Sequence, residues 1–465
     1  MDNQKNTGEL TTNAPDKPKE QQAVQPHRRG RAVAVPVLHK VNKEDVPLHE
    51  ESKLSEAEPT VNSTESKKKA KKAKKWNRKW LLLIIPALFV LLLLIGYITF
   101  VFVPIPIVRA WRNIYIETAM TTGDHQWLAT SFIPKYIIDD VMDVEQQPPD
   151  MVGGITTEPL DTGNETSDPT ETEEPDSSDT EEIQTPPVEP AEPDILGLAD
   201  LKVGDKDYAG NTVVVANKEE GLFISEIAEK GVLGFSYKGF VMLIDDPSRV
   251  FVGTTPEKDT RGYRIGEMMS YYGDVIAGIN ASGFSDPNEE GRGCDIIGYC
   301  MSEGEAWGTY IYGYTSIVLT NDNKLGVGYI GQWEQKGIRD GMQFYPTLIV
   351  DGKIMVEGSA GYGLHPRTAI GQREDGAIIM LVIDGRDPLH SVGCTVGDMA
   401  LIMEKYGAIN AGCCDGGSSC VLAYEGTVLN KNSSMNPTYG RRIPNAFLVR
   451  SKKQAADNSE VTSEP

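Results

Sequence analysis

The sequence predicts an α+β domain that is rich in sheet and has few helices, preceded by one transmembrane helix. Two observations lead to this fold class. An almost unbroken apolar run covers residues 80–103, and the chain after it carries short apolar runs bordered by Gly, Pro and Asn. Short runs with such borders are typical of strands. The runs are residues 212–216, 240–244, 275–279, 315–319, 347–350, 377–383, 420–424 and 446–449.

Helical patterns are scarcer in the same region. The best one begins at Thr395, which can serve as an N-cap, with Asp398 three residues later in the position of a capping box. An apolar stripe follows, and Gly407 is expected to end the helix. Residues 266–271 form a second candidate helix. Many strands and few helices favour a domain built on sheets.

The long apolar run at residues 80–103 is sufficient to cross a bilayer core of roughly 30 Å. A cleaved signal peptide is disfavoured, because the charged leader would be about 79 residues long. A buried core helix is the other alternative, but such helices rarely exceed about 14 uninterrupted apolar residues. The lysine-rich block at residues 67–79 is expected to stay in the cytoplasm. The sequence therefore predicts a single-pass cell-membrane protein with a cytoplasmic N-terminus and an extracellular C-terminal domain.

The domain organisation follows from changes in composition. We expect a disordered basic tail (1–79), the transmembrane helix (80–103), a juxtamembrane helical segment (104–144), an acidic Thr/Glu/Pro-rich spacer (145–194), the sheet-rich domain (195–450) and a polar tail (451–465). The spacer is expected to extend by self-repulsion and to hold the domain away from the membrane.

The charge distribution argues against nucleic acid as a partner. The formal net charge is −22, and the spacer holds sixteen Asp or Glu residues and no Lys or Arg. Nucleic-acid phosphates need neutralisation by Lys and Arg, which such a polyanionic segment opposes.

All six cysteines lie between Cys294 and Cys420, in the part expected outside the membrane. An oxidising compartment permits disulfides, although six cysteines allow 15 pairings. Cys413 and Cys414 are adjacent, so their side chains should point in opposite directions and have different partners. A zinc site is a more specific alternative to disulfides, but no Cys-x₂-Cys spacing occurs. We expect disulfides or inert buried thiols, and no cofactor or metal.

Candidate site residues gather where strand-like runs end. Residues 275–279 lead into Asn280, residues 377–383 into Asp384 and Arg386, and residues 408–412 into Asp415. Loops at strand ends often display reactive groups on a rigid scaffold. Each cluster taken alone is also compatible with an ordinary turn, since Asp-Gly is a common turn sequence.

Five motifs together resemble one family. In chain order they are Gly278-Ile-Asn-Ala-Ser-Gly-Phe284, His365-Pro-Arg-Thr-Ala-Ile-Gly-Gln372, Val382-Ile-Asp-Gly-Arg386, residues 410–419 and Gly440-Arg-Arg-Ile-Pro-Asn-Ala-Phe447. They resemble the phosphodiester glycosidase family, which includes N-acetylglucosamine-1-phosphodiester alpha-N-acetylglucosaminidase-like enzymes and bacterial exopolysaccharide-biosynthesis-type proteins. The resemblance covers roughly residues 212–450. The membrane span and residues 118–128 are similar to membrane-anchored members from Gram-positive bacteria. The chain departs from the family at Cys413 and Cys414, where relatives commonly have Asn-Leu, and this suggests added disulfides near the site.

The resemblance implies hydrolysis of a sugar linked through C1 to a phosphodiester. Ordinary glycosidases need two carboxylates, one of which protonates a poor leaving group. A phosphate monoester leaves more easily, so one carboxylate and a fixed positive charge can suffice. Asp415 is the first candidate for nucleophile or general base, and Asp384 is the second. Asn280 is expected to hold a sugar hydroxyl or to position the water.

The same resemblance implies a phosphate clamp. Arg367 and Arg386 are its candidates, because guanidinium matches phosphate oxygens bidentately. The N–H groups of Gly416, Gly417 and Ser418 are expected to add to the clamp.

Alternatives exist for several of these residues. Arg386 could pair with Asp384 or Asp387, Arg367 could cap a sheet edge, and Asp415 could be a turn residue. His365 is expected to be a surface histidine. A divalent ion held by Asp384, Asp387 and Asp415 is compatible with the sequence, but no spacing requires it.

We therefore expect a membrane-anchored extracellular hydrolase that removes a sugar from a sugar-1-phosphodiester on a cell-envelope glycan or exopolysaccharide. The alternative from another class is a non-catalytic protein that binds anionic glycan or scaffolds envelope-assembly proteins. A phosphodiesterase that cleaves the P–O bond is a third hypothesis, and it would require a tight metal site.

Overall fold

The computed structural model describes residues 78–123, 125–143, 194–286, 291–331 and 333–452. The predicted N-terminal tail and almost all of the predicted acidic spacer lie outside these residues, as does most of the C-terminal tail.

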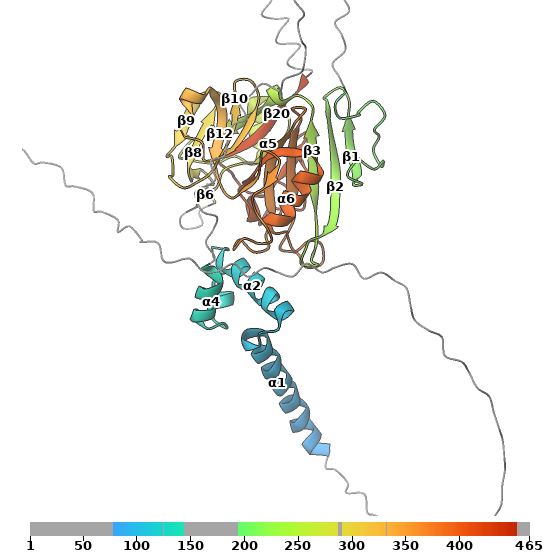
Figure 1. Ribbon diagram of the computed structural model, residues 1–465, viewed down its shortest axis with the longest axis vertical. Coiled ribbons are helices and arrows are strands. Elements are labelled where there is room, and N and C mark those ends of the chain that lie inside the picture. Colours follow the sequence, from blue (N-terminus) through green and yellow to red (C-terminus); the bar gives the residue numbers. More distant parts are fainter. Residues whose placement is uncertain (1–77, 124, 144–193, 287–290, 332, 453–465) are drawn as a thin grey trace, which may run out of the picture. The chain divides into compact units, whose positions relative to one another are not determined.

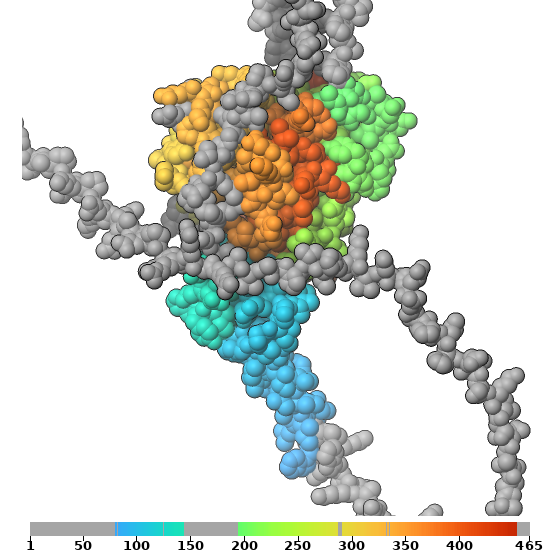
Figure 2. Space-filling model, in the orientation of Figure 1, coloured from blue at the N-terminus to red at the C-terminus, as the bar shows by residue number. Residues whose placement is uncertain are grey.

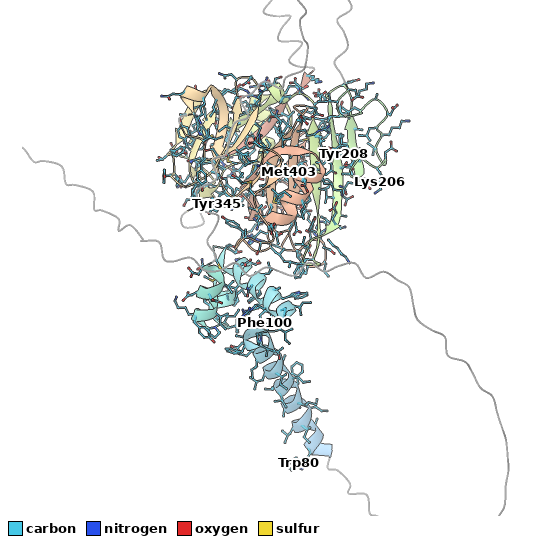
Figure 3. All side chains as sticks on the ribbon, viewed as in Figure 1. Trp80, Phe100, Lys206, Tyr208, Tyr345 and Met403 are labelled. Carbon is cyan, nitrogen blue, oxygen red and sulfur yellow. The ribbon has the colours of Figure 1, made fainter. Side chains whose placement is uncertain are left out.

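Four helices form the first described part of the chain: α1 (Arg78–Phe102), α2 (Pro106–Met120), α3 (Trp127–Thr130) and α4 (Lys135–Met142). Residues Leu82–Phe102 of α1 are long and apolar enough to cross a membrane. The apolar side chains along this helix are exposed, and Trp80 and Phe100 are labelled towards its two ends in Figure 3. Helices α2 to α4, together with Val101 at the end of α1, bury a small apolar cluster that includes Ile116, Ala129 and Ile137. One helix thus suggests membrane anchoring, and the segment after it contains the three helices α2, α3 and α4.

The large sheet contains eight antiparallel strands in the order β1-β2-β3-β16-β15-β17-β13-β14. Figure 1 shows its green strands β1 to β3 on one side of the domain. The strands are β1 (Thr212–Asn217), β2 (Leu222–Lys230), β3 (Ser236–Ile244), β13 (Thr347–Val350), β14 (Lys353–Ile354), β15 (Arg367–Arg373), β16 (Ile378–Ile383) and β17 (Ala408–Cys414).

Two five-stranded sheets and a two-stranded ribbon complete the strand set among the described residues. One sheet has the order β11-β10-β12-β8-β9, and the other has the order β19-β18-β5-β20-β4. The strands are β4 (Val250–Thr254), β5 (Val275–Asn280), β6 (Phe284–Ser285), β7 (Asp295–Ile296), β8 (Tyr299–Ser302), β9 (Glu305–Gly308), β10 (Ser316–Thr320), β11 (Leu325–Gly328), β12 (Ile338–Gln343), β18 (Leu422–Tyr424), β19 (Thr427–Val428) and β20 (Asn445–Arg450). The remaining helices are α5 (Ile265–Tyr272), α6 (Val396–Lys405), η1 (Pro247–Arg249), η3 (Glu334–Lys336) and η4 (Gly417–Ser419).

The large sheet is buried on both faces, and its central strand β16 shows this directly. Ile379 and Leu381 join an apolar cluster with Met403 of α6, whereas Met380 and Val382 join a second cluster with residues of the two five-stranded sheets. Successive side chains of a strand point to opposite faces, so one six-residue apolar run can serve two cores. Figure 2 shows the orange-to-red surface of the later strands and α6 beside the green surface of β1 to β3.

The predicted elements are found. Each of the eight short apolar runs coincides with a strand, within a few residues at its ends. Thr395 is the N-cap of α6, and its hydroxyl accepts a hydrogen bond from the backbone N–H of Asp398. The Asp398 carboxylate accepts one from the backbone N–H of Thr395, which completes the predicted capping box. The α+β, sheet-rich fold class is therefore confirmed.

Candidate active site

The topology of the large sheet explains why distant motifs meet. Strand β15 lies between β16 and β17 and is antiparallel to both, so the ends of β16 and β17 lie at the start of β15. Arg367 pairs with Ile383, and Thr368 pairs with Cys414. Asp384 and Asp415 each follow the last residue of their strand. The three motifs are thus brought to one edge of the sheet, at the strand spacing of about 4.8 Å.

A cavity of about 470 Å³ opens at this edge. Its volume falls within the range of about 300–1,000 Å³ that small-molecule sites commonly have. Predicted residues from three motifs line it together with aromatic side chains and a segment near α2. The lining residues are Thr121, Thr122, Gly123, His125, Phe284, Phe344, Tyr345, Tyr362, His365, Arg367, Arg386, Cys414, Asp415, Gly416, Gly417, Ser418, Ser419 and Arg441.

Asp415 is the carboxylate at this cavity. Its backbone N–H donates to the carbonyl of Ala281 at 2.8 Å, and its Oδ1 accepts from the N–H of Gly416 at 3.0 Å. Burial raises the pKa of Asp415 to about 6, against the opposing effects of a hydrogen bond from Ser419 and the charges of Arg441 and Arg386. A carboxyl with this pKa is largely ionised near pH 7 and can still accept a proton, as a general base requires.

Arg386 supplies a cation at the same cavity. Its backbone φ is 62°, a conformation that non-glycine residues rarely adopt and that clusters at functional sites. Its guanidinium has no hydrogen bond or ion pair with any described residue, so the predicted alternative of an ion pair with Asp384 or Asp387 is not found. A Cβ added at Gly417 would lie 3.0 Å from Nη2 of Arg386. The guanidinium therefore lies directly over the Asp415-Gly416-Gly417 loop.

Arg441 also lines the cavity, and the sequence analysis did not assign it. Its Nη1 donates to Ser418 Oγ at 3.2 Å, and its Nη2 pairs with Asp286 at 3.1 Å. Its guanidinium lies over the ring of Phe284, with 4.5 Å to the ring centroid. The signal was present in the Gly440-Arg441-Arg442 motif, which was used only for the resemblance.

Arg367 reaches the cavity wall with most of its hydrogen-bonding capacity already used. Its Nε donates to the carbonyl of Cys394, and its Nη2 donates to the carbonyls of Tyr362 and Gly363, each at 2.9 Å. This pattern holds two loops together at the start of β15. Arg386 consequently has more free capacity for an anion than Arg367 has.

Two predicted catalytic residues do not line the cavity. Asn280 is buried: its Nδ2 donates to the carbonyl of Asp415 at 2.7 Å, and its Oδ1 accepts from Thr368 Oγ1 at 2.8 Å. Asp384 is also buried, with its carboxylate bonded to His390 at 2.8 Å and Asn430 at 3.0 Å. Both side chains are thus hydrogen-bonded inside the protein, and neither is among the residues that line the cavity.

The predicted backbone clamp is also partly occupied. The N–H of Gly416 donates to the Asp415 carboxylate at 3.0 Å, and the N–H of Gly417 donates to the carbonyl of Pro366 at 2.9 Å. Of the three predicted donors, Ser418 alone has no acceptor for its N–H among the described residues. Gly416 and Gly417 therefore shape the loop more than they offer donors.

His365 is buried, contrary to the expected surface position. Its Nε2 lies 2.8 Å from Thr121 Oγ1. Burial and the charges of Arg367 and Arg386 lower the pKa of His365 to about 3, so the imidazole is neutral at physiological pH.

The six cysteines are buried and unbridged. Cys413 packs in the cluster that contains α6, and Cys414 packs in the other, so the adjacent side chains point in opposite directions as expected. Burial raises the pKa of both thiols, which keeps them protonated and unreactive. The added disulfides expected near the site are not found. The described residues contain no group of three or more His, Cys, Asp and Glu side chains that could hold a metal ion.

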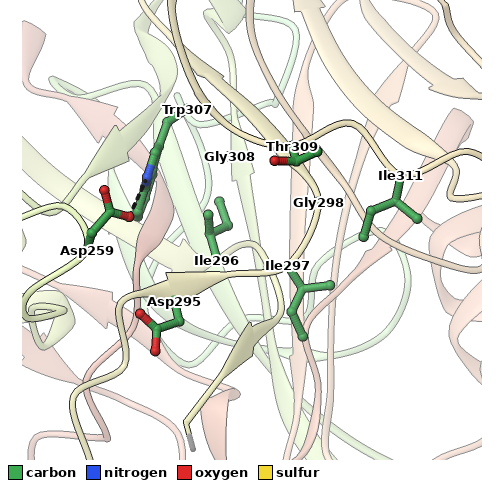
Figure 4. A pocket seen from close by; sticks show the side chains of 9 residues that line it. All are labelled: Asp259, Asp295, Ile296, Ile297, Gly298, Trp307, Gly308, Thr309 and Ile311. Carbon is green, nitrogen blue, oxygen red and sulfur yellow. Dashed lines mark hydrogen bonds between the residues drawn. The ribbon is translucent and has the colours of Figure 1, made fainter. Parts of the chain in front are cut away.

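A second cavity, of about 570 Å³, lies beside β7 and β9. Figure 4 shows Trp307 donating to Asp259 at one side of it, with isoleucine side chains to the right of this pair, and the hydrogen bond is 3.2 Å long. None of the sequence-predicted site residues lines this cavity, and no Arg or Lys occurs among the described residues that do. The first cavity is therefore the candidate active site.

The fold and the site define a sheet-rich domain whose cavity combines one carboxylate with arginines. Residues 273–450 match the phosphodiester glycosidase family, so this part of the chain is a phosphodiester glycosidase domain and the predicted resemblance is confirmed. A curated relative, the SPbeta prophage-derived uncharacterized protein YomE of Bacillus subtilis (strain 168), is 32% identical over 203 residues. That match covers 40% of this chain and only 29% of the relative.

Solved structures also show similarity, at low sequence identity. The catalytic domain of zebrafish N-acetylglucosamine-1-phosphodiester alpha-N-acetylglucosaminidase, auto-inhibited by its pro-peptide, is 16% identical with a TM-score of 0.43. The match covers 50% of this chain and 83% of that one. A hypothetical protein from Synechocystis is 15% identical with a TM-score of 0.38, over 52% of this chain and 64% of that one.

Proposed function

We propose that this domain is a glycoside hydrolase that releases a sugar from a glycosyl phosphodiester. The observation that carries the proposal is the placement of Asp415, with its pKa raised to about 6, beside the free guanidinium of Arg386 at one cavity. The family match supports a hydrolase kind of activity.

In the proposed reaction the substrate phosphate binds at Arg386 and Arg441, and the sugar C1 lies towards Asp415. Attack at C1 breaks the bond between C1 and the bridging oxygen, whose electron pair leaves with the phosphate monoester. Fixed guanidinium charges stabilise the negative charge that develops there. Because this leaving group needs little protonation, one carboxylate is sufficient.

Asp415 can act in either of two ways. As a general base it takes the proton from the attacking water. As a nucleophile it forms a glycosyl ester that water then hydrolyses. Both routes yield a free sugar and a phosphate monoester. The supporting bonds from Asn280 and Gly416 fix the loop that carries the carboxylate in either case.

The test is hydrolysis of UDP-N-acetylglucosamine, or another sugar-1-phosphodiester, by the full chain in ¹⁸O-labelled water. We expect free sugar with the label at C1 from wild type and none from Asp415→Asn. Asp375→Asn, in the exposed turn between β15 and β16, is the matched control. Sugar-1-phosphate with the label on phosphorus would contradict the proposal and indicate P–O cleavage. Binding without turnover would indicate a non-catalytic glycan-binding protein.

We further propose that the chain acts at the cell membrane, anchored through α1, on a cell-envelope glycan or exopolysaccharide that carries sugar-1-phosphodiesters. The lysine block before α1 supports an extracellular domain. Protease protection in sealed right-side-out vesicles tests this orientation, since the sheet-rich domain should be cleaved without detergent and the N-terminal tail should not.

A further inference from the structure

The end of α2 is bonded to the loop that precedes β15. Thr118 Oγ1 donates to the carbonyl of Ile114 at 2.6 Å and accepts from the backbone N–H of Leu364 at 3.0 Å. Thr121 Oγ1 donates to the carbonyl of Glu117 at 2.6 Å, so it must accept from Nε2 of His365. This bond selects the neutral imidazole with its proton on Nε2. The juxtamembrane segment and the domain thus meet through specific polar contacts.

The contact is also close-packed. Gly363 has a φ of +61°, and a Cβ added there would lie 2.5 Å from the backbone nitrogen of Thr118. Glu117 is buried in the same region, and the rings of Trp111 and Phe235 lie 5.0 Å apart. The juxtamembrane segment and the domain are therefore packed directly against each other at this contact.

The same segment forms part of the cavity wall. Thr121, Thr122, Gly123 and His125 line the cavity that contains Asp415 and Arg386. The two parts of the wall differ in chemistry. Residues of the domain contribute the carboxylate and the arginines, whereas the segment contributes hydroxyl groups and an imidazole. Hydroxyl and imidazole groups can form hydrogen bonds with sugar hydroxyls, and the arginines suit phosphate.

The docked segment leaves room for a ligand. The cavity volume of about 470 Å³ is what remains with Thr121, Thr122, Gly123 and His125 in place, and it is sufficient for a sugar with its phosphate. The segment therefore encloses the cavity without filling it.

We propose that Thr121, Thr122, Gly123 and His125 of the juxtamembrane segment form the sugar-binding wall of the active site, so that the complete site requires two parts of the chain. Thr122 and His125 contact the sugar in this arrangement, and Thr121 holds the segment in place through His365. This inference rests on the proposed function for the identity of the ligand. It concerns a part of the chain outside residues 273–450.

The first experiment compares substitutions in the full chain, reconstituted in nanodiscs with UDP-N-acetylglucosamine as the probe. We expect Thr122→Ala and His125→Ala each to raise KM on the order of tenfold, the cost of a lost ligand hydrogen bond, with a smaller change in kcat. Thr130→Ala is the matched control. Both threonine hydroxyls donate to the carbonyl four residues earlier, but Thr130 lies outside the cavity. Unchanged KM in both cavity variants would overturn the proposal.

The second experiment separates the segment from the domain. Gly363→Ala introduces a methyl group against Thr118, whereas Gly361→Ala introduces one at a similar positive φ with nothing within 4 Å. We expect the first variant to expose the amides of residues 117–122 to hydrogen exchange and to reduce kcat/KM at least tenfold relative to the second. Increased turnover in Gly363→Ala would overturn the proposal and identify the segment as a plug.

The proposed sugar-binding wall can still be tested if the wild-type protein does not catalyse the proposed reaction. Should wild type release no sugar, calorimetric binding of the same probe replaces turnover. Weaker binding by Thr122→Ala and Gly363→Ala, but not by their controls, would support the proposal that the segment forms the sugar-binding wall. Equal binding by all four variants would overturn it.

Discussion

The side-chain amide of Asn280 donates a hydrogen bond of 2.7 Å to the backbone carbonyl of Asp415. The amide oxygen of the same residue accepts from Thr368 Oγ1 at 2.8 Å and from the N–H of Val421 at 3.1 Å. One buried side chain from β5 thus joins the start of β15 to both ends of the loop that carries the candidate catalytic carboxylate.

Replacing Asn280 by Ala should therefore weaken both stability and activity. The substitution leaves buried donors and an acceptor without partners, which costs about 2–4 kcal/mol in the free energy of unfolding. We expect kcat/KM to fall at least tenfold, because the Asp415 loop loses its position. Denaturant unfolding and steady-state kinetics measure the two effects. Asn217→Ala is the control: it loses bonds to Tyr424 and Glu220 far from the cavity, so it should affect stability alone. Normal kinetics in a folded Asn280→Ala protein would contradict the assignment.

Arg386→Ala should reduce catalysis without unfolding the domain. Its guanidinium has no partner among the described residues, so its removal costs little stability, whereas a charge-assisted contact to phosphate is worth about 1.5–3 kcal/mol. We expect kcat/KM to fall about 10- to 150-fold. Arg373→Ala, at the other end of β15, should leave kcat/KM unchanged. An equal loss in both variants would indicate a general electrostatic effect and not a phosphate contact.

The pH dependence of the reaction should report Asp415. Its pKa is raised to about 6, and both proposed roles require the ionised form. Lowering the pH through 6 protonates the carboxylate, so kcat/KM should fall about tenfold per pH unit below that value. A pH-rate profile on a substrate whose phosphate stays ionised over this range isolates the enzyme group. A flat profile between pH 5 and 7 would exclude Asp415 from both roles.

Elements that are specified by residues close together in the chain could be predicted from the sequence. Thr395 and Asp398 lie three residues apart, so their capping box could be predicted from the local sequence alone. The burial of β16 on both faces likewise follows from one unbroken apolar run. Convergence of Arg367, Arg386 and Asp415 on one cavity was expected because each follows or begins a strand.

Other features depend on contacts that are distant in the sequence. Asn280 ends a strand, and Asp384 follows one as Asp415 does, yet only the packing of the sheets determines that Asn280 and Asp384 are buried. Thr121 and His365 are 244 residues apart, and no local pattern pairs them. Arg441 follows no apolar run, so the strand pattern gives no sign that it lines the cavity, although it belongs to one of the five motifs.

Because the cysteines are unbridged, we predict that reductant does not change the stability of the protein. Since the six cysteines are buried and unbridged, adding dithiothreitol should leave the melting temperature unchanged. Thiol titration should find few reactive groups in the native protein and six after denaturation. A lower melting temperature in dithiothreitol would instead show that the protein contains disulfides.

Asp415→Asn should stabilise the protein while it abolishes activity, and the stabilisation should depend on pH. The pKa of Asp415 rises from an ordinary value of 3.8 to about 6 on folding, mainly because burial disfavours the charged carboxylate. The unfolded chain therefore binds fewer protons than the folded one between these values, and the contribution of Asp415 to stability falls as the pH rises from about 4 to 6. At pH 7 the ionised carboxylate costs at most about 3 kcal/mol.

Asparagine carries no charge and avoids this cost, so we expect the variant to gain about 1–3 kcal/mol at pH 7 and little at pH 4. Chemical denaturation of both proteins at the two pH values measures the difference, and subtracting them cancels every other titrating group. Asp375→Asn should gain nothing at pH 7, because it removes an exposed ion pair with Arg373. An Asp415→Asn protein that is less stable than wild type at pH 7 would mean that hydrogen bonds to the carboxylate outweigh its burial. The residue would then be a structural turn position, and the argument that burial destabilises an ionised catalytic carboxylate would fail.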